Sequence, residues 1–314
     1  MKRTFMPLLL ILLFLMMLSN PAETFQGASE GLLLWFQTVL PTLLPFLIIT
    51  NLLVATNTMR YMTQIVSPIL SPVFQTSSSG TFAIISGFLC GYPMGAKVTA
   101  DLLKSGKIEK EEASYLLSFC NNTSPMFLMN YVVLQKIGED SLLVPSLCIL
   151  LLPPFLLSFL FRFFYRKREN RTGGASPKHS VSETSVSFHF ELFDEAIMNG
   201  FETITKVGGY IILFSVLLTL LKGVPIENAF WNHLLLPSLE VTNGVSMISA
   251  SGLLFPIRYS MILGIVAFGG ICAIAQTKCM LNGTGIPLLP YIIEKLITAI
   301  VTSLLAFCYI SSVC

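Results

Sequence analysis

The stretch GFLCGYPMGAKVTADLLKSG, residues 87–106, decides how the rest of the chain is interpreted. Its apolar residues are typical of a membrane helix, yet glycines and Pro93 interrupt it and Lys97 follows. Lipid offers no hydrogen-bond partner to an unwound backbone, so such a break is tolerated only where it is buried in protein or lines a water-filled cavity. We therefore expect an unwound segment that faces a solute. The structural alternative is that the glycines only allow close helix packing.

The composition around this stretch is that of an integral membrane protein. Of the 314 residues, 54% are hydrophobic and 11% are charged, whereas a soluble domain carries about 25% charged residues. Several apolar runs reach the roughly 20 residues that cross a bilayer as a helix. The sequence thus predicts an all-α polytopic membrane protein whose partners are the lipid bilayer and a small-molecule substrate. A net charge of +2 gives no reason to expect nucleic acid, and a homo-oligomer is a possible assembly.

Positive charges set the orientation of the predicted helices. Lys2 and Arg3 place the N-terminus in the cytoplasm, ahead of a membrane helix within residues 1–27 that resembles an uncleaved signal sequence. The basic residues 166–168 place the polar segment 169–188 in the cytoplasm as a linker. The chain then divides into residues 28–168 before the linker and residues 189–314 after it.

An internal repeat relates these two parts. Residues 30–88 match residues 195–253 without a gap, and the match pairs Pro72 with Pro237 and Ser86–Gly87 with Ser251–Gly252. The first copy starts outside and the second inside, so the repeats are predicted to be inverted, each with a re-entrant hairpin and a broken helix. Inverted repeats with broken helices are typical of secondary transporters, which bind their solute near the bilayer midplane.

Two groups of candidate substrate-binding residues lie in the first repeat. We expect the turn QTSSSG, residues 75–80, to form the inner end of the first hairpin, although it can also be a solvated turn. The unwound stretch follows, where Lys97 can offer a positive charge to an anion or can be a boundary lysine whose charge reaches the membrane surface. The candidates from these two segments are Ser77, Ser78, Ser79, Gly91, Tyr92, Pro93 and Lys97.

Polar residues inside apolar helices supply the other candidates. Asn121, Asn122 and Thr123 interrupt a helix that begins near Glu109, where they can bind a substrate or only pack. Glu240, in the predicted second hairpin, is a carboxylate at membrane depth and the candidate site for a coupling H⁺ or Na⁺; the alternative is that it is exposed. Asn243 and Gln276 are further candidate substrate contacts.

The sequence gives no sign of catalysis or of a metal site. Its seven cysteines and three histidines lack ligand spacing, and the predicted spans contain no HExxH motif, no paired aspartates of the GxGD type and no Ser–His arrangement. We expect a protein that is not an enzyme and that has no cofactor apart from a coupling ion.

The runs LWFQTVLPTLLPFLIITNLL, SGFLCGYPMGAK, SYLLSFCNNTSPMF and LEVTNG resemble the YlbJ family of sporulation integral membrane proteins. These are Gate, or nucleoside-recognition, domain proteins, which are similar to concentrative nucleoside transporters. The resemblance implies transport of dipicolinate during sporulation, in the mother-cell-derived outer forespore membrane. Position 90 of the glycine motif is Cys here, and the chain looks shorter than many members. The alternatives are a nucleoside-type transporter and a non-transporting membrane scaffold for spore assembly.

Overall fold

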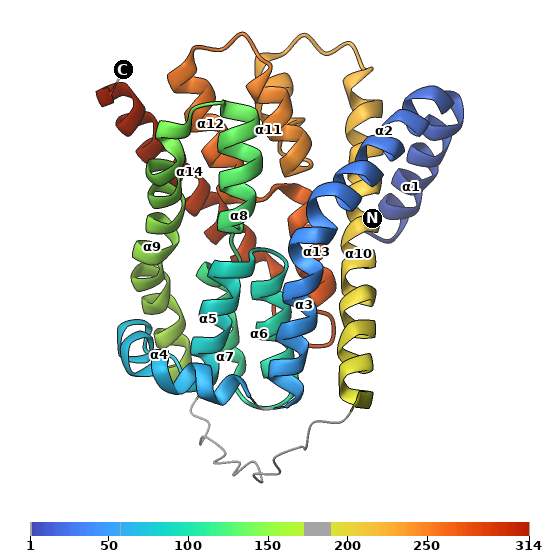
Figure 1. Ribbon diagram of the computed structural model, residues 1–314. Coiled ribbons are helices and arrows are strands. Elements are labelled where there is room, and N and C mark those ends of the chain that lie inside the picture. Colours follow the sequence, from blue (N-terminus) through green and yellow to red (C-terminus); the bar gives the residue numbers. More distant parts are fainter. Residues whose placement is uncertain (1, 57, 173–189, 314) are drawn as a thin grey trace.

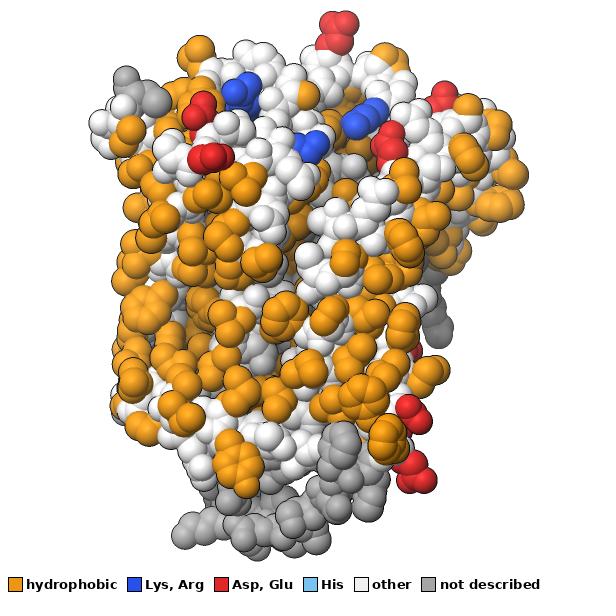
Figure 2. All heavy atoms as spheres, in the orientation of Figure 1, with side chains coloured by type: hydrophobic (Ala, Val, Ile, Leu, Met, Phe, Trp, Pro, Cys, Tyr) orange, Lys and Arg blue, Asp and Glu red, His pale blue; other side chains and the backbone are white. Residues whose placement is uncertain are grey.

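The computed structural model describes residues 2–56, 58–172 and 190–313, which form helices and no strands. Most of the predicted linker, residues 169–188, lies outside the described residues. Five helical runs are long and apolar enough to cross a membrane: Pro21–Ala55, Asp140–Tyr165, Phe190–Lys222, Phe255–Met280 and Leu288–Val313. Figure 2 shows hydrophobic side chains over the flank of the molecule, with charged side chains mostly near its ends. The prediction of an all-helical membrane protein is therefore confirmed.

Short helices and breaks separate the long spans. The part before the linker contains α1 (Lys2–Ser19), α2 (Pro21–Leu34), η1 (Trp35–Val39), α3 (Leu40–Ala55), α4 (Met59–Phe74), α5 (Ser78–Cys90), α6 (Met94–Lys104), α7 (Lys110–Cys120), α8 (Pro125–Phe127), η2 (Leu128–Ile137), η3 (Asp140–Leu142) and α9 (Leu143–Thr172). The part after it contains α10 (Phe190–Lys222), η4 (Trp231–Leu235), α11 (Val241–Ser249), α12 (Phe255–Phe268), α13 (Gly270–Met280) and α14 (Leu288–Val313).

Local sequence explains where several helices begin or end. Gly91 ends α5 with φ +84° and Gly269 ends α12 with φ +84°, a left-handed region that glycine adopts at little cost. Ser124 precedes Pro125 and accepts a hydrogen bond from the Phe127 N–H at 3.2 Å, so α8 begins with a capped first turn. The predicted breaks near 91–93 and 121–124 and the helix start near Glu109 are thus found in the structure.

The helices pack as pairs around a common centre (Figure 1). The long helix α10 lies along α2 and α3, α12 lies along α14, α7 lies along α9, and α5 and α6 form an antiparallel hairpin. Figure 1 places α5, α6 and α7 in the lower half and α8, α11 and α12 in the upper half. We call the lower end, where α9 ends and α10 begins, the linker-side end.

Small residues let α2 approach the long helix α10 closely. A Cβ atom added at Gly31 of α2 would lie 2.8 Å from the Cα of Ile212, and one at Gly27 would lie 2.8 Å from the Cα of Val216. Close backbone approach through small residues is how helices associate in lipid, where apolar burial alone gives no driving force. The α2–α10 pair therefore depends on these two glycines.

The first hairpin differs from the expectation in its register. The turn at residues 75–77 lies at the linker-side end, where α4 meets α5 (Figure 1), and the inner turn is instead residues 91–93, between α5 and α6. The ungapped repeat match also pairs different elements at its far end. Ser86 and Gly87 lie inside α5, whereas Ser251 and Gly252 lie in the loop after α11.

Candidate functional site

Four irregular segments meet near the centre of the molecule. They are the turn 91–93, the unwound segment 121–124 between α7 and α8, the turn 236–240 before α11, and Gly269 between α12 and α13. A Cβ atom at Gly91 would lie 2.5 Å from the Ser124 nitrogen, and one at Gly269 would lie 3.1 Å from the Tyr92 ring. The Ile271 N–H donates to the Ser238 carbonyl at 2.8 Å. Each break therefore touches another.

A small cavity, the central cavity, lies among these breaks and the helices α3 and α10. Its volume is about 60 Å³, and its walls are mostly apolar. The polar side chains that line it include Thr42, Tyr92, Thr123, Ser124, Glu240 and Gln276, and no lysine or arginine is among the lining residues. The Tyr92 hydroxyl is buried and has no hydrogen-bond partner within the described residues. The cavity thus offers hydrogen-bonding groups and one carboxylate in an apolar setting.

Glu240 is placed at this cavity by the start of α11. Its side chain is 2% exposed, and its two carboxylate oxygens accept hydrogen bonds from the backbone N–H groups of Thr242 at 3.2 Å and Asn243 at 2.8 Å. The positive end of the helix dipole stabilises a carboxylate at this position. A Cβ atom at Gly244 would overlap the Pro237 carbonyl oxygen, so the glycine allows the turn to fold back on α11.

Within the unwound segment 121–124, Thr123 and Ser124 line the central cavity, whereas Asn121 and Asn122 bond to neighbouring groups. The Asn121 amide nitrogen donates to Thr277 Oγ1 at 2.9 Å and to the Tyr291 hydroxyl at 2.8 Å, and Asn122 Nδ2 donates to the Phe119 carbonyl at 2.5 Å. Both asparagines are therefore held by neighbouring groups and do not line the central cavity. Thr123 lines it, although its hydroxyl donates to the Val266 carbonyl at 2.7 Å.

The serines of the turn QTSSSG lie away from the central cavity. The Ser77 N–H donates to Glu112 Oε1 at 2.6 Å, and the Ser67 hydroxyl donates to Ser78 Oγ at 3.2 Å. Ser77 lines a separate open cavity at the linker-side end with Glu109 and Glu112, and Ser79 is half-buried in the first turn of α5. Burial raises the pKa of the Glu112 carboxyl, and the hydrogen bond from Ser77 partly offsets this increase.

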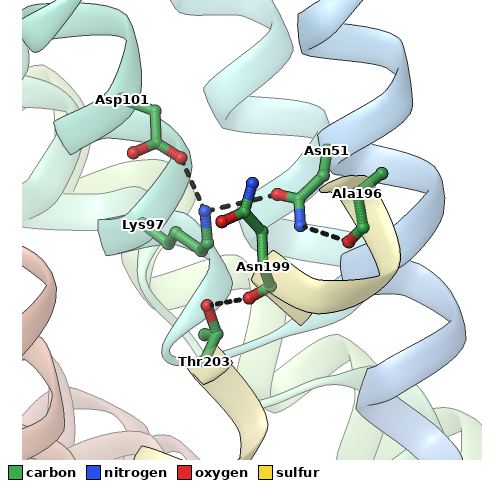
Figure 3. A network of polar contacts seen from close by, with 6 residues as sticks. All are labelled: Asn51, Lys97, Asp101, Ala196, Asn199 and Thr203. Atoms are coloured by element: carbon green, nitrogen blue, oxygen red, sulfur yellow. Dashed lines mark hydrogen bonds and ion pairs between the residues drawn. The ribbon is translucent and has the colours of Figure 1, made fainter. Parts of the chain in front are cut away.

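Lys97 also lies outside the central cavity, in a polar network between α3, α6 and α10 (Figure 3). Its ammonium group pairs with Asp101 Oδ2 at 2.8 Å and donates to Asn51 Oδ1 at 3.3 Å. The Asn51 amide in turn donates to the Ala196 carbonyl at 3.2 Å, and Figure 3 shows the Asn199 side chain beside this pair. The charge of Lys97 is therefore balanced by an acidic neighbour and does not face the cavity.

Of the remaining candidates, Tyr92 and Gln276 line the central cavity, whereas Asn243, Gly91 and Pro93 do not. Gln276 lines the cavity and donates to Cys272 Sγ at 3.3 Å. Asn243 instead donates to Ser215 Oγ at 2.9 Å and ties α11 to α10. Gly91 and Pro93 shape the backbone of the inner turn beside Tyr92, which is the residue of that turn that lines the cavity.

Sequence reasoning missed the polar residues of α14. Tyr291, Glu294 and Lys295 are buried in this apolar span, and two of them bond to the unwound segment 121–124. The pair Glu294–Lys295 within the run PYIIEKLITAIV was the available signal, because ionisable residues inside membrane helices are costly and usually functional.

Comparisons with known proteins relate this chain to a family model and to an integral membrane protein. Residues 36–140 match the model of a family described as Gate, nucleoside recognition. The chain is 27% identical over 312 residues to the sporulation integral membrane protein YlbJ of Bacillus subtilis (strain 168), covering 90% of this chain and 76% of that protein. No solved structure gives a significant match. The resemblance inferred from the sequence motifs is confirmed.

Proposed function

We propose that this protein moves a small solute across a membrane, with the solute bound at the central cavity. The observation that supports this most is the meeting of four helix breaks at a cavity that contains the buried Glu240 carboxylate. Backbone breaks at membrane depth are tolerated where they line a solute path, and ionisable residues there mark substrate or ion sites. A scaffold for spore assembly has no need of such a cavity.

The order of the elements supports an inverted-repeat mechanism. Each part of the chain has a long span (α3 or α10), a hairpin, a broken helix and a second long span (α9 or α14). In Figure 1, α3 and α9 run toward the linker-side end, whereas α10 and α14 run away from it. In such proteins one repeat moves against the other around a fixed site. The cavity of about 60 Å³ holds a few water molecules, so binding an aromatic solute requires the hairpins to separate.

Two solute classes follow from the lining of the cavity and from the comparisons. Dipicolinate, an aromatic dicarboxylate, is the solute implied by the resemblance to the YlbJ family, and the Tyr92 hydroxyl and the Gln276 amide are donors that its carboxylates would need, because the N-terminus of α11 already holds the Glu240 carboxylate. A nucleoside is the second candidate, since no lysine or arginine lines the cavity and the matched family is described as nucleoside recognition. Tyr92, Thr123 and Gln276 would contact either solute, and Glu240 would bind a substrate group or a coupling H⁺ or Na⁺.

Uptake into proteoliposomes tests the proposal. Labelled dipicolinate and labelled uridine would be offered separately to vesicles that hold the full chain, with a pH gradient, with a Na⁺ gradient and with neither. We expect the variant Glu240→Gln to lower uptake by roughly tenfold or more, since hydrogen bonds to charged groups contribute about 1.5–3 kcal/mol. The matched control is Glu227→Gln, which changes an exposed glutamate in the loop before η4.

The outcomes separate the candidate functions. Uptake of one solute that falls in Glu240→Gln and persists in Glu227→Gln supports the proposal and identifies the solute class. Uptake of neither solute under any gradient would refute transport of these classes and favour the scaffold. Fluorescence microscopy of a tagged chain in sporulating cells would test placement in the outer forespore membrane.

A further inference from the structure

Lys295 is a buried cation beside the broken helix. It lies within the span α14, its side chain is 1% exposed, and it forms no salt bridge with the carboxylates of the described residues. Its ammonium group donates to the Asn121 carbonyl at 2.8 Å and to Asn122 Oδ1 at 3.1 Å. A charged lysine at membrane depth is costly and is a functional hypothesis by default.

The two oxygen atoms that hold Lys295 are of the type that hold a metal cation. One is a backbone carbonyl at the end of α7, where the helix dipole is negative, and the other is a side-chain amide oxygen. In secondary transporters, unwound backbone carbonyls and half-helix C-terminal ends bind the coupling Na⁺ or H⁺. Here the lysine supplies the positive charge that a bound ion would supply elsewhere.

The same segment joins Lys295 to the central cavity. Asn121, whose carbonyl accepts from Lys295, also bonds through its amide to Thr277 of α13 and to Tyr291. Thr123, two residues further along, lines the cavity. A change in the charge of Lys295 therefore acts on the backbone that forms one wall of the cavity.

Glu294, the residue before Lys295 in α14, has polar neighbours that lead toward the linker-side end. The neighbouring Glu294 accepts a hydrogen bond from the Tyr165 hydroxyl at 2.7 Å, and its second carboxylate oxygen is buried without a partner in the described part of the chain. Tyr165 lines a small cavity together with Glu294 and also lines the open cavity that contains Glu112. A series of polar groups thus extends from α14 to the surface at the linker-side end.

Helices α7, α9 and α12 pack against α14, and each carries titratable groups of its own. Tyr291 and Glu294 lie on α14 itself, and α7 contributes Cys120 and Tyr115. Helix α9 contributes Tyr165 and Arg162, and α12 contributes Tyr259, whose hydroxyl pairs with Ser146 at 2.9 Å. Lys295 is the one of these groups that bonds to the unwound backbone as a cation.

We propose that the Lys295 ammonium group is the resident coupling cation of this protein, in place of a bound metal ion. When protonated it holds segment 121–124 through Asn121 and Asn122. When it loses its proton to water on the linker-side route marked by Glu294 and Tyr165, the amine is neutral and the segment is released. This inference rests on the proposed function, because coupling has meaning only where a solute moves.

Hydrogen–deuterium exchange tests, without any solute, whether the protonation of Lys295 controls the order of segment 121–124. Exchange of peptides spanning residues 117–125 would be measured against pH on the purified full chain and corrected for the intrinsic pH dependence of amide exchange. We expect protection in the wild type to follow the titration of one group. In Lys295→Met the protection should be low and independent of pH, and in Lys295→Arg it should be high and independent of pH. The control Lys136→Met removes a lysine that bonds to Ser246 Oγ at 3.0 Å and should keep the wild-type profile.

The wild type alone keeps the proposal falsifiable if the variants do not fold. Its melting temperature should be the same in NaCl and in KCl of equal ionic strength. Specific stabilisation by Na⁺, or protection of residues 117–125 that does not change with pH, would overturn the assignment to Lys295.

Transport assays separate this inference from the proposed function. Uptake of dipicolinate or uridine that is driven by a pH gradient without Na⁺, and that becomes insensitive to this gradient in Lys295→Met, supports it. Uptake driven by Na⁺ alone would overturn it while the proposed function stands. No uptake, with pH-dependent exchange that Lys295→Met removes, would refute the proposed function and the coupling role but leave the titration of Lys295 established.

Discussion

At the scale of single residues, Glu112 shows how burial and a hydrogen bond act on one carboxyl group. Burial raises its pKa above the ordinary value of 4.5, and the N–H of Ser77 opposes this effect. A carboxyl whose pKa is higher in the folded than in the unfolded state favours folding in its protonated form. Its contribution to stability is therefore present below the unfolded pKa and lost as the pH rises through the folded pKa.

The variant Glu112→Gln tests whether the ionised Glu112 carboxylate makes the folded protein less stable at high pH. Glutamine keeps an oxygen that accepts from Ser77 but carries no charge, so we expect its melting temperature to exceed that of the wild type more at pH 8 than at pH 4. Thermal unfolding in detergent at the two pH values measures the difference. The exposed Glu191→Gln on α10 is the control, and an equal effect of Glu112→Gln at both pH values would contradict the argument.

Single residues also show what the sequence could and could not predict. The breaks at 91–93 and 121–124 were predictable because glycine, proline and asparagine signals are local. Which of two turns forms the inner end of the first hairpin was not, because QTSSSG and GYP both have turn chemistry. That choice depends on long-range packing, since a Cβ atom at Gly87 or Gly95 would overlap the Cys120 carbonyl of α7. Lys97 and Lys295 likewise differ in role through partners that lie far apart in the sequence.

At the scale of elements, the contact of α2 with α10 is set by backbone approach. The Cβ position of Gly31 lies 2.8 Å from the Ile212 backbone, whereas nothing lies within 4 Å of the Cβ position of Gly209 on α10. We expect Gly31→Leu to destabilise the protein by about 1–3 kcal/mol through overpacking. In Gly209→Leu the gain in helix propensity over glycine, roughly 0.8–1 kcal/mol, should leave stability unchanged or raised. Thermal unfolding of both variants measures this contrast, and equal melting temperatures would mean that the two helices do not pack in this way.

At the scale of the whole molecule, binding a solute larger than the central cavity requires the second hairpin to move relative to α10, the long span of its own repeat, because both line the cavity. Asn243 of α11 and Ser215 of α10 bond side chain to side chain at 2.9 Å beside Glu240. Ser67 of α4 and Ser78 of α5 also bond side chain to side chain, at 3.2 Å, but at the linker-side end and away from the central cavity. The first pair joins elements whose separation would widen the central cavity, and the second joins elements that would move together.

Cysteine pairs at these positions distinguish a moving structure from a fixed one. In a background without the native cysteines, Ser215→Cys with Asn243→Cys, and Ser67→Cys with Ser78→Cys, would each be bridged by a short bis-thiol reagent. We expect the first bridge to abolish uptake of whichever solute the wild type carries and the second to leave it near the wild-type rate. Uptake that survives the first bridge would mean that the second hairpin stays on α10 throughout the cycle. The solute would then have to enter by the movement of another part of the lining, such as the α5–α6 hairpin, because Tyr92 in the turn of that hairpin also lines the central cavity.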